Sequence, residues 1–323
     1  MRKLVVLLFI LITVMGISGV GIWWAIGSVG GEEKTVTFVI PQRRGDFKVA
    51  TVLKEQGLIK HEWAFSLLWG LLGGVSFNSG GYRLRPAMNT LEVVRRLSSE
   101  PDLYWLIIPE GLRKEQIGEV LTKILGWDDG KTEQWNNYYQ TTTAEYQEGV
   151  YFPDTYLLPK DESGEQIAKR FIARFNEKFA PLSEQFLAKD IRWTTGLKIA
   201  SLIQREAAGS QDMNLISGII WNRLENNMKL DIDATLQYIK GKSGGYWWAP
   251  ISVADKKLQS PFNTYIFRGL PPTPITNPGL AAIEAALNPQ ETNCLFYLHD
   301  RSREIHCSET YEGHMENIKK YLL

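Results

Sequence analysis

A chain of 323 residues can bury a sizeable core, and its 44% hydrophobic and 22% charged residues are typical of folded globular proteins, which excludes a disordered chain. Its 36 Lys and Arg residues equal its 36 Asp and Glu residues, so no basic field exists to attract nucleic acid. We therefore expect no nucleic-acid partner.

The N-terminal segment from Leu4 to Ile26 carries no charge, and as a helix it is long enough to span the hydrocarbon layer of a membrane, about 30 Å. Arg2 and Lys3 precede it, so the positive-inside rule leaves the N-terminus in the cytoplasm and places the body on the other side. A cleaved signal peptide is the alternative, but its apolar core is usually shorter and no clear cleavage site follows. We expect residues 1–30 to be a single-pass anchor in the cytoplasmic (inner) membrane, with the C-terminal body in the periplasm or extracytoplasmic space.

A repeated unit opens this body. Residues 39–53 and 107–121 align without a gap, and both read apolar residue, Ile, Pro, a polar stretch and then a helical pattern. Each copy follows a strand-like run, so each predicts a strand, a proline turn and a helix. Between the copies, the almost wholly apolar residues 63–72 predict a buried helix, and residues 81–86 predict a strand. We expect an α+β domain over residues 33–150.

The remaining residues, 151–323, have a different texture and are expected to form a second α+β domain. A helix is predicted from about Glu165 to Phe179, because apolar residues recur at helical spacing along it. Phe171 and Phe175 belong to this stripe and are expected in the core. A further helix is predicted over residues 196–208.

An acid falls on the apolar stripe of this further helix. Ile199, Leu202, Ile203 and Glu206 lie at i, i+3, i+4 and i+7. A partly desolvated glutamic acid has a raised pKa and can donate a proton near neutral pH. The alternative is that Glu206 ends the stripe and reaches water beside Arg205.

Two further acids and an arginine follow along the chain. Arg223 lies at the edge of an apolar helical stripe, where it would face a cleft. Asp231 and Asp233 alternate with apolar residues as on a strand. Asp233 also has the position of an N-cap for the helix that follows, and Thr235 lies in the first turn of that helix.

A proline-rich loop over residues 259–279 leads into another helix, with Asn277 placed as its N-cap and Pro278 at its first position. Within the loop, Asn263, Thr264 and Tyr265 bring an amide, a hydroxyl and an aromatic ring together, as recognition of a sugar requires.

The remaining motifs give no sign of a metal or a cofactor. The four histidines are scattered, and no Ser-His-Asp elbow or glycine-rich phosphate loop is present in the sequence. Cys294 and Cys307 flank a predicted hairpin, so a cross-strand disulfide and a pair of free buried thiols are both open.

Five motifs, in order along the body, resemble those of the YceG-like family, the membrane-bound endolytic murein transglycosylases: GVYFPDTYLLP, ASLIQRE, IIWNRL, LDIDATLQY and SPFNTY with GLPPTPITNPG. The resemblance covers nearly the whole body, and its first half is similar to the LysM-related region of that family. By motif position it implies that Glu206 is the catalytic acid. Many members have a second acid where this chain has Gln204, which argues against a paired-carboxylate mechanism at those two positions.

The resemblance further implies an enzyme that cleaves the β-1,4 bond between N-acetylmuramic acid and N-acetylglucosamine within a glycan strand and leaves a 1,6-anhydro end, without a cofactor. Asn263, Thr264 and Tyr265 become candidates for binding the sugar. Second candidates are Arg223, Asp233 and Thr235. The implied partners are peptidoglycan strands, the cytoplasmic membrane and peptidoglycan synthases.

Two other functions stay open. One is a muramidase that uses Glu206 with Asp233 and releases reducing ends, and the other is a membrane-tethered scaffold that binds glycan without cleaving it.

Overall fold

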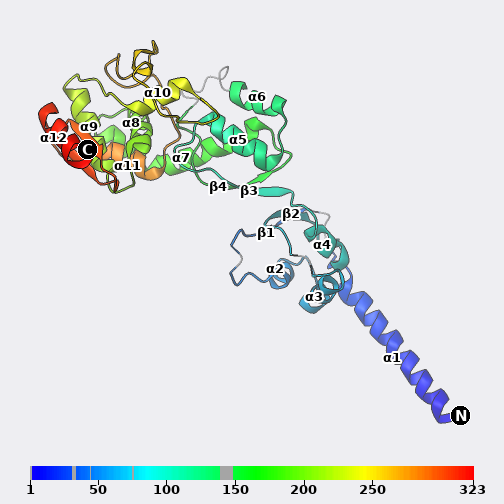
Figure 1. The fold of residues 1–323 in the computed structure, drawn as a ribbon. Helices are drawn as coiled ribbons and strands as arrows, with labels where there is room; N and C mark the ends of the chain where they lie inside the picture. Colours follow the sequence, from blue (N-terminus) through cyan, green and yellow to red (C-terminus); the bar gives the residue numbers. More distant parts are fainter. Residues whose placement is uncertain (1, 31–33, 44, 75, 139–147) are drawn as a thin grey trace. The chain divides into compact units, whose positions relative to one another are not determined.

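The structure is a computed structural model that describes residues 2–30, 34–43, 45–74, 76–138 and 148–323. Helices and strands are mixed along the chain, which confirms the predicted α+β class (Figure 1). The described chain forms two compact units: the first contains residues 1–106 with 156–161, and the second contains residues 107–155 with 162–323.

The first unit begins with the predicted apolar helix. Helix α1 (Arg2–Ile26) contains one apolar span, Val6–Ile26, with a mean hydropathy of 2.4. No other helix in the described part of the chain is long and apolar enough to cross a membrane. The side chains of this span are exposed almost throughout, as expected for a helix whose natural surroundings are lipid.

The first unit continues with strand β1 (Val36–Ile40), helices α2 (Val49–Glu55) and α3 (Glu62–Leu71), strand β2 (Gly80–Leu84) and helix α4 (Thr90–Leu97). Strands β1 and β2 pair antiparallel over five residue pairs. Phe38 and Tyr82 face each other in this ladder and are fully buried, with Leu53 of α2 and Leu97 of α4 in the same core.

The predicted repeat is confirmed as a succession of elements. In the first copy β1 and Pro41 precede α2, and in the second copy β3 (Leu103–Ile107) and Pro109 precede α5 (Lys114–Leu125). Strand β4 (Thr155–Pro159) completes a four-stranded sheet in the order β1-β2-β3-β4. The LysM-related nature of this region stays a prediction.

The two compact units do not coincide with the segments 33–150 and 151–323. Helix α5 packs with α6 (Asp129–Tyr138), and α6 packs with α7 (Gly164–Ala188) of the C-terminal half. The second copy of the repeat therefore contributes its helix to the second unit. The assignment of functional domains to the two segments stays a prediction.

The second unit is mainly helical. Beyond α5 to α7 it contains α8 (Trp193–Glu206), α9 (Met213–Glu225), α10 (Asp233–Lys240), a 3-10 turn η1 (Asp255–Lys257), α11 (Leu280–Leu287), strands β5 (Phe296–His299) and β6 (Ile305–Ser308), and α12 (Tyr311–Tyr321). Helix α8 lies at its centre and packs against α7, α9, α10 and α11. The aromatic stripe of α7, including Phe171 and Phe175, is buried as predicted.

The close packing of α8 depends on a glycine. A Cβ atom at Gly196 would overlap the ring of Phe186 in α7, so only glycine lets the two helices approach to this distance. The register of α8 then buries Ile199, Leu202 and Ile203 completely, as their spacing predicts.

Several local predictions are wrong. Helix α3 is not buried on all sides, since Trp63 and Leu71 are exposed. Asp231 lies in an irregular segment rather than a strand, because Ile232 and Thr264 link this segment to the proline-rich loop and not to a neighbouring strand. Asn277 is not the N-cap of α11, because Gly279 has that position. The amide of Asn277 donates instead to the buried carboxyl of Glu148.

Candidate active site

Glu206 is the last residue of α8 and lies directly beyond the buried stripe of that helix. Its side chain is partly buried. Burial raises the pKa of the Glu206 carboxyl, and the neighbouring charge of Asp233 raises it further, while Tyr297, His299 and Arg205 act in the opposite direction. The net effect is an acid that holds its proton at higher pH than an ordinary glutamic acid.

Tyr297 fixes the orientation of this carboxyl. Its hydroxyl donates a hydrogen bond to Oε2 of Glu206 at 2.6 Å. Burial raises the pKa of Tyr297 well above its usual value, with the charge of Glu206 adding to the effect, so the hydroxyl stays protonated and remains a donor. Because Oε2 accepts this bond, Oε1 is the oxygen on which we expect the acidic proton of Glu206.

The turn after Glu206 is held by a second pair. The buried carboxylate of Asp212 accepts hydrogen bonds from the backbone N–H groups of Ala208 at 2.9 Å and Gly209 at 3.2 Å. Its Oδ2 atom lies 2.7 Å from Nε2 of His299. His299 and Tyr297 are two residues apart on β5, so their side chains leave the strand on the same face, toward the end of α8.

A disulfide bond joins Cys294 and Cys307, which decides between the two alternatives that the sequence left open. The predicted hairpin is present as β5 and β6, and Tyr297 is the cross-strand partner of Cys307. The disulfide therefore closes the hairpin next to Tyr297, the residue that donates a hydrogen bond to Glu206.

Asp233 is the other acid near Glu206. It is the first residue of α10, not the residue before the helix, and its Oδ1 accepts a hydrogen bond of 2.5 Å from the hydroxyl of Tyr265. Burial and then Asp233 raise the pKa of Tyr265, so this hydroxyl also stays a donor. Tyr265 and Asp233, predicted separately from the sequence, are brought together.

Asn263 and Thr264 are buried beneath Tyr265. The amide of Asn263 donates to the backbone oxygens of Lys256 and Leu258 and accepts from the backbone N–H of Tyr265. This amide thus shapes the loop that presents Tyr265.

Thr235 and Arg223 are buried as well. The hydroxyl of Thr235 lies 3.0 Å from that of Thr264, joining α10 to the proline-rich loop. The guanidinium of Arg223 donates to the backbone oxygens of Leu230 and Leu295, at 2.6 Å each, and so ties α9 to the segment before α10 and to the strand that carries Tyr297.

The residues just before Glu206 are engaged in packing. The guanidinium of Arg205 lies over the ring of Trp248, with 4.1 Å between its central carbon and the ring centroid. Oε1 of Gln204 accepts from the backbone N–H of Gly279 at 2.9 Å, and its Nε2 lies 3.4 Å from Oε2 of Glu110. Gln204 thus links the end of α8 to Gly279, the N-cap residue of α11.

Sequence reasoning missed Tyr297, His299 and Asp212. The signal that could have identified the first two is their alternation in the run FYLH, which puts both on one face of a strand. Nothing local indicates that this face meets the end of α8, because 91 residues separate Tyr297 from Glu206.

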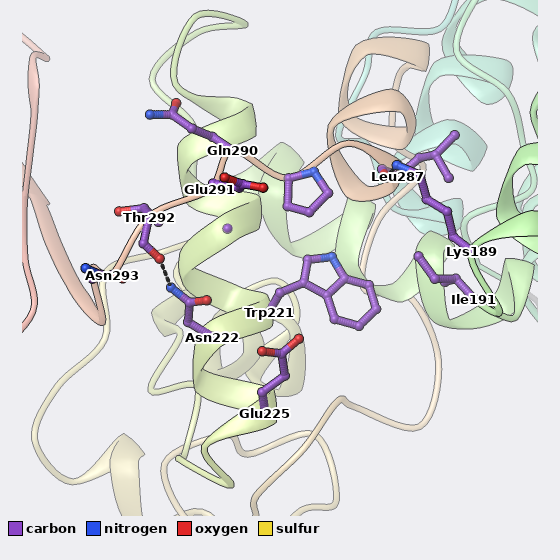
Figure 2. A pocket seen from close by; sticks show the side chains of 12 residues that line it. Lys189, Ile191, Trp221, Asn222, Glu225, Leu287, Gln290, Glu291, Thr292 and Asn293 are labelled. Carbon is purple, nitrogen blue, oxygen red and sulfur yellow. Dashed lines mark hydrogen bonds between the residues drawn. The ribbon is translucent and has the colours of Figure 1, made fainter.

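A separate pocket lies between α9 and α11, with a cavity of about 480 Å³ (Figure 2). Trp221, Asn222 and Glu225 of α9 line it, and Asn222 donates to the backbone oxygen of Thr292. Among the residues that the structure describes, neither Glu206 nor Tyr297 lines it. This pocket is therefore distinct from the site around Glu206.

The hairpin turn brings two acids and a histidine together. Ligand atoms of Asp300, Glu304 and His306 lie within 4.8 Å of one another. The carboxylate of Asp300 accepts from the backbone N–H groups of Ser302 and Glu304 and bonds to His306, so it serves the turn itself.

The comparisons with known proteins identify the family of this chain. The model of the YceG-like family matches residues 38–320, so the chain belongs to the YceG-like family. A crystal structure of a YceG-like protein from Listeria monocytogenes is similar, with 25% sequence identity and a TM-score of 0.58, covering 88% of this chain and 99% of that one.

Relatives named endolytic murein transglycosylase match most of this chain. The protein of Streptococcus pneumoniae serotype 2 (strain D39) is 27% identical, over 90% of this chain and 59% of the relative. The protein of Bacillus subtilis (strain 168) is 28% identical, over 89% of this chain and 85% of the relative. The chain thus spans about three fifths of the length of the pneumococcal relative.

Proposed function

We propose that this protein is an endolytic peptidoglycan lytic transglycosylase with Glu206 as its catalytic acid and base. The observation that carries the proposal is the Glu206 carboxyl at the end of a buried helix, with a raised pKa and one oxygen held by Tyr297. The names of the relatives support the same reaction.

The chemistry needs one acid that works twice. Protonated Oε1 of Glu206 donates its proton to the bridging oxygen between N-acetylmuramic acid and N-acetylglucosamine, and the bond from C1 to that oxygen breaks. The resulting carboxylate takes the proton from the C6 hydroxyl of the muramic acid, whose oxygen forms a new bond to C1. The products are a free 4-hydroxyl and a 1,6-anhydro end, and no water is consumed.

Intramolecular attack makes a second catalytic carboxylate unnecessary, because the nucleophile is already part of the bound sugar. Asp233 then has a different role: its negative charge raises the pKa of Glu206 and favours the positive charge that develops at C1. Tyr265 orients Asp233 and offers its ring to the sugar, and Asn263, Thr264, Thr235 and Arg223 hold these groups in place from behind.

The proximity of Asp233 to Glu206 also favours a second candidate, a muramidase in which Asp233 assists attack by water or forms a covalent intermediate. The two reactions differ in product, since hydrolysis adds one water and leaves a reducing end. The mass of the released fragments distinguishes them.

The proposed location is the cytoplasmic membrane, spanned once by α1, with the rest of the chain after α1 on the extracytoplasmic side. Arg2 and Lys3 at the N-terminal end of the apolar span support this orientation. The Cys294–Cys307 disulfide supports it independently, because disulfides persist in oxidising compartments. Glycan strands would then be cleaved near the membrane, where peptidoglycan synthases extend them.

The test is Glu206→Gln. Glutamine keeps the size of the side chain and an oxygen for Tyr297, but it cannot donate the proton, so release of anhydro ends from purified glycan strands should fall by at least about 100-fold. Strand binding, measured by co-sedimentation, should be retained.

Glu225→Gln is the matched control, since Glu225 is likewise the last residue of a helix but is exposed at the separate pocket. It should keep full activity. Anhydro ends formed at the normal rate by Glu206→Gln would refute the proposed role, and a wild-type protein that binds strands without shortening them would indicate the glycan-binding scaffold instead.

A further inference from the structure

Helix α3 in the first unit has two apolar faces. One packs inward: Ala64 and Phe65 are buried, and Leu68 and Trp69 lie against the core of the unit. The other points outward and consists of Trp63, Ser66, Leu67, Gly70 and Leu71, which follow one another at i, i+3, i+4, i+7 and i+8. We call these five residues the outer face of α3.

The outer face carries large exposed apolar groups and no charge. Trp63 is 51% exposed, Leu67 47% and Leu71 73%. The charged residue of the helix, Glu62, is turned aside, where it accepts from the hydroxyl of Thr51 at 2.9 Å and lies 3.6 Å from Nζ of Lys54. A helix that meets water on one side normally presents charged residues there, so this face is built to be covered.

The outer face begins beside the end of α1. The ring of Trp24 lies 5.5 Å from that of His61, and the ring of His61 lies 6.1 Å from that of Trp63. Lys60 donates to the backbone oxygen of Trp24 at 3.2 Å, with its ammonium 4.8 Å from the centre of the Trp24 ring. Three aromatic rings therefore connect the end of the apolar span to the first residue of the outer face.

This connection identifies what covers the face. Tryptophans at the end of a membrane-spanning helix lie at the level of the lipid headgroups, and Trp23 and Trp24 occupy that position in α1. Trp63 is then held at the same level, and Leu67 and Leu71 extend the apolar surface about 12 Å along α3 from Trp63.

We propose that the outer face of α3 lies in the boundary between headgroups and acyl chains of the extracytoplasmic leaflet, beside the anchor, and that Lys60 faces the lipid phosphates. An apolar stripe with an aromatic residue at one end and a lysine next to it is the pattern of an interfacial helix. The inference rests on the proposed membrane anchorage and not on the chemistry of Glu206. It gives the protein a second, peripheral contact with the bilayer.

The test uses the full-length protein in proteoliposomes of phosphatidylethanolamine and phosphatidylglycerol, with an environment-sensitive fluorophore on a single introduced cysteine. The native cysteines are joined in a disulfide and do not compete for the label. Three positions are compared: Ser66→Cys on the outer face, Arg95→Cys on the exposed and charged face of α4, and Ser18→Cys within α1.

We expect lipids with a spin label near the headgroups to quench the fluorophore at position 66, while the fluorophore at position 95 responds only to aqueous iodide. The fluorophore at position 18 should be quenched by spin labels deeper in the acyl chains, which establishes the anchor independently. Equal access of iodide to positions 66 and 95, with position 18 still shielded, would overturn the inference and leave the anchor intact.

A double variant, Leu67→Glu with Leu71→Glu, adds a second measurement. Both side chains are exposed, so the fold should be retained, and the two charges should move the fluorophore at position 66 toward water and reduce its lipid quenching by about half or more. Gln56→Glu, an exposed change at the end of α2, should leave the quenching unchanged. Shielding of position 66 that appears only at high protein density, without lipid quenching, would indicate a second copy of the chain and contradict the proposal.

Discussion

At the scale of single residues, Tyr297 distinguishes the two oxygens of the Glu206 carboxyl. Its hydroxyl donates to Oε2, so in the proposed mechanism Oε1 carries the proton that is transferred. It also lowers the pKa of Glu206 against the upward effect of burial, which keeps the group able both to give and to regain a proton.

Replacing Tyr297 by Phe should therefore change the pH dependence as well as the rate. Without the donor, the carboxylate form of Glu206 is less stable and the pKa of Glu206 rises further, so activity should persist to higher pH before it falls. The rate at the optimum should drop about tenfold because the carboxyl is no longer oriented, with little change in KM. A pH profile of kcat measures both effects.

If Tyr297→Phe lowered kcat equally at every pH, the tyrosine would be only a structural support. Tyr311→Phe, an exposed tyrosine at the start of α12, is a suitable control that should leave the profile unaltered.

The sequence predicted the place of Glu206 on its helix but not its hydrogen-bond partner Tyr297, and the reason is physical. The position of Glu206 follows from the helical spacing of Ile199, Leu202 and Ile203, which is a local property. Its hydrogen bond to Tyr297 joins elements 91 residues apart, and no periodicity encodes such a contact.

At the scale of elements, the hairpin of β5 and β6 positions the side chains of Tyr297 and His299. Four residue pairs form its ladder, and the disulfide closes it beside Tyr297. Arg223 links this hairpin to α9, because its guanidinium donates a hydrogen bond to the backbone oxygen of Leu295.

Removing the disulfide should make the β5–β6 hairpin less rigid. Cys294→Ser with Cys307→Ser opens a loop with a sequence separation of 13, and the chain-entropy argument predicts a loss of about 2 to 4 kcal/mol in the free energy of unfolding. Activity should fall as well, because the position of Tyr297 is less fixed. Urea unfolding and anhydro-end release check the two effects.

Wild-type protein kept in a strong reductant should behave like the double serine variant. An unchanged unfolding midpoint in both would show that the hairpin is held by its other contacts alone.

Elements with strong periodicity were predictable, and those set by tertiary contacts were not. The stripes of α7 and α8 follow the sequence, but local spacing predicts a helix cap at the buried Asn277, because its partner Glu148 lies 129 residues away. For α3, the apolar composition predicts burial, whereas the structure leaves Trp63, Leu67 and Leu71 exposed.

At the scale of the whole molecule, Glu148 joins segments that are distant in the sequence. Its buried carboxyl accepts from the backbone N–H of Lys114 at 3.0 Å and from the amide of Asn277 at 2.6 Å. The amide of Asn277 also donates to the backbone oxygen of Leu112. The beginning of α5 and the proline-rich loop are thus held together through one acid.

This acid makes the stability of the second unit depend on pH. Burial, with the nearby charge of Glu115, raises the pKa of Glu148 well above its ordinary value. The folded state then binds the proton more tightly than the unfolded state, so this contribution to stability is complete below the unfolded pKa of about 4.3 and is lost as pH rises toward the folded pKa.

Glu148→Gln cannot titrate and should lose less stability than the wild type as pH is raised above about 4.3. Thermal unfolding of the detergent-solubilised protein across this range measures the two slopes, with the exposed substitution Glu133→Gln as control. Parallel slopes for Glu148→Gln and the wild type would show that Glu148 does not titrate in the way proposed.

The α+β class and the N-terminal apolar helix could be predicted at this scale, because composition and hydropathy depend on the sequence alone. The division into two units could not, since strand β4 returns to the sheet of the first unit about fifty residues after β3. The position of β4 in this sheet results from packing between distant segments, and no local pattern in the sequence predicts it.

The side chain of Gln204 meets an acid on one side and a backbone donor on the other. Its Nε2 lies 3.4 Å from Oε2 of Glu110, and its Oε1 accepts from the N–H of Gly279. A glutamate at this position could still accept from Gly279, but its second oxygen would face the carboxylate of Glu110, and two carboxylates at that distance repel each other. A neutral amide is therefore the group that satisfies both neighbours at once.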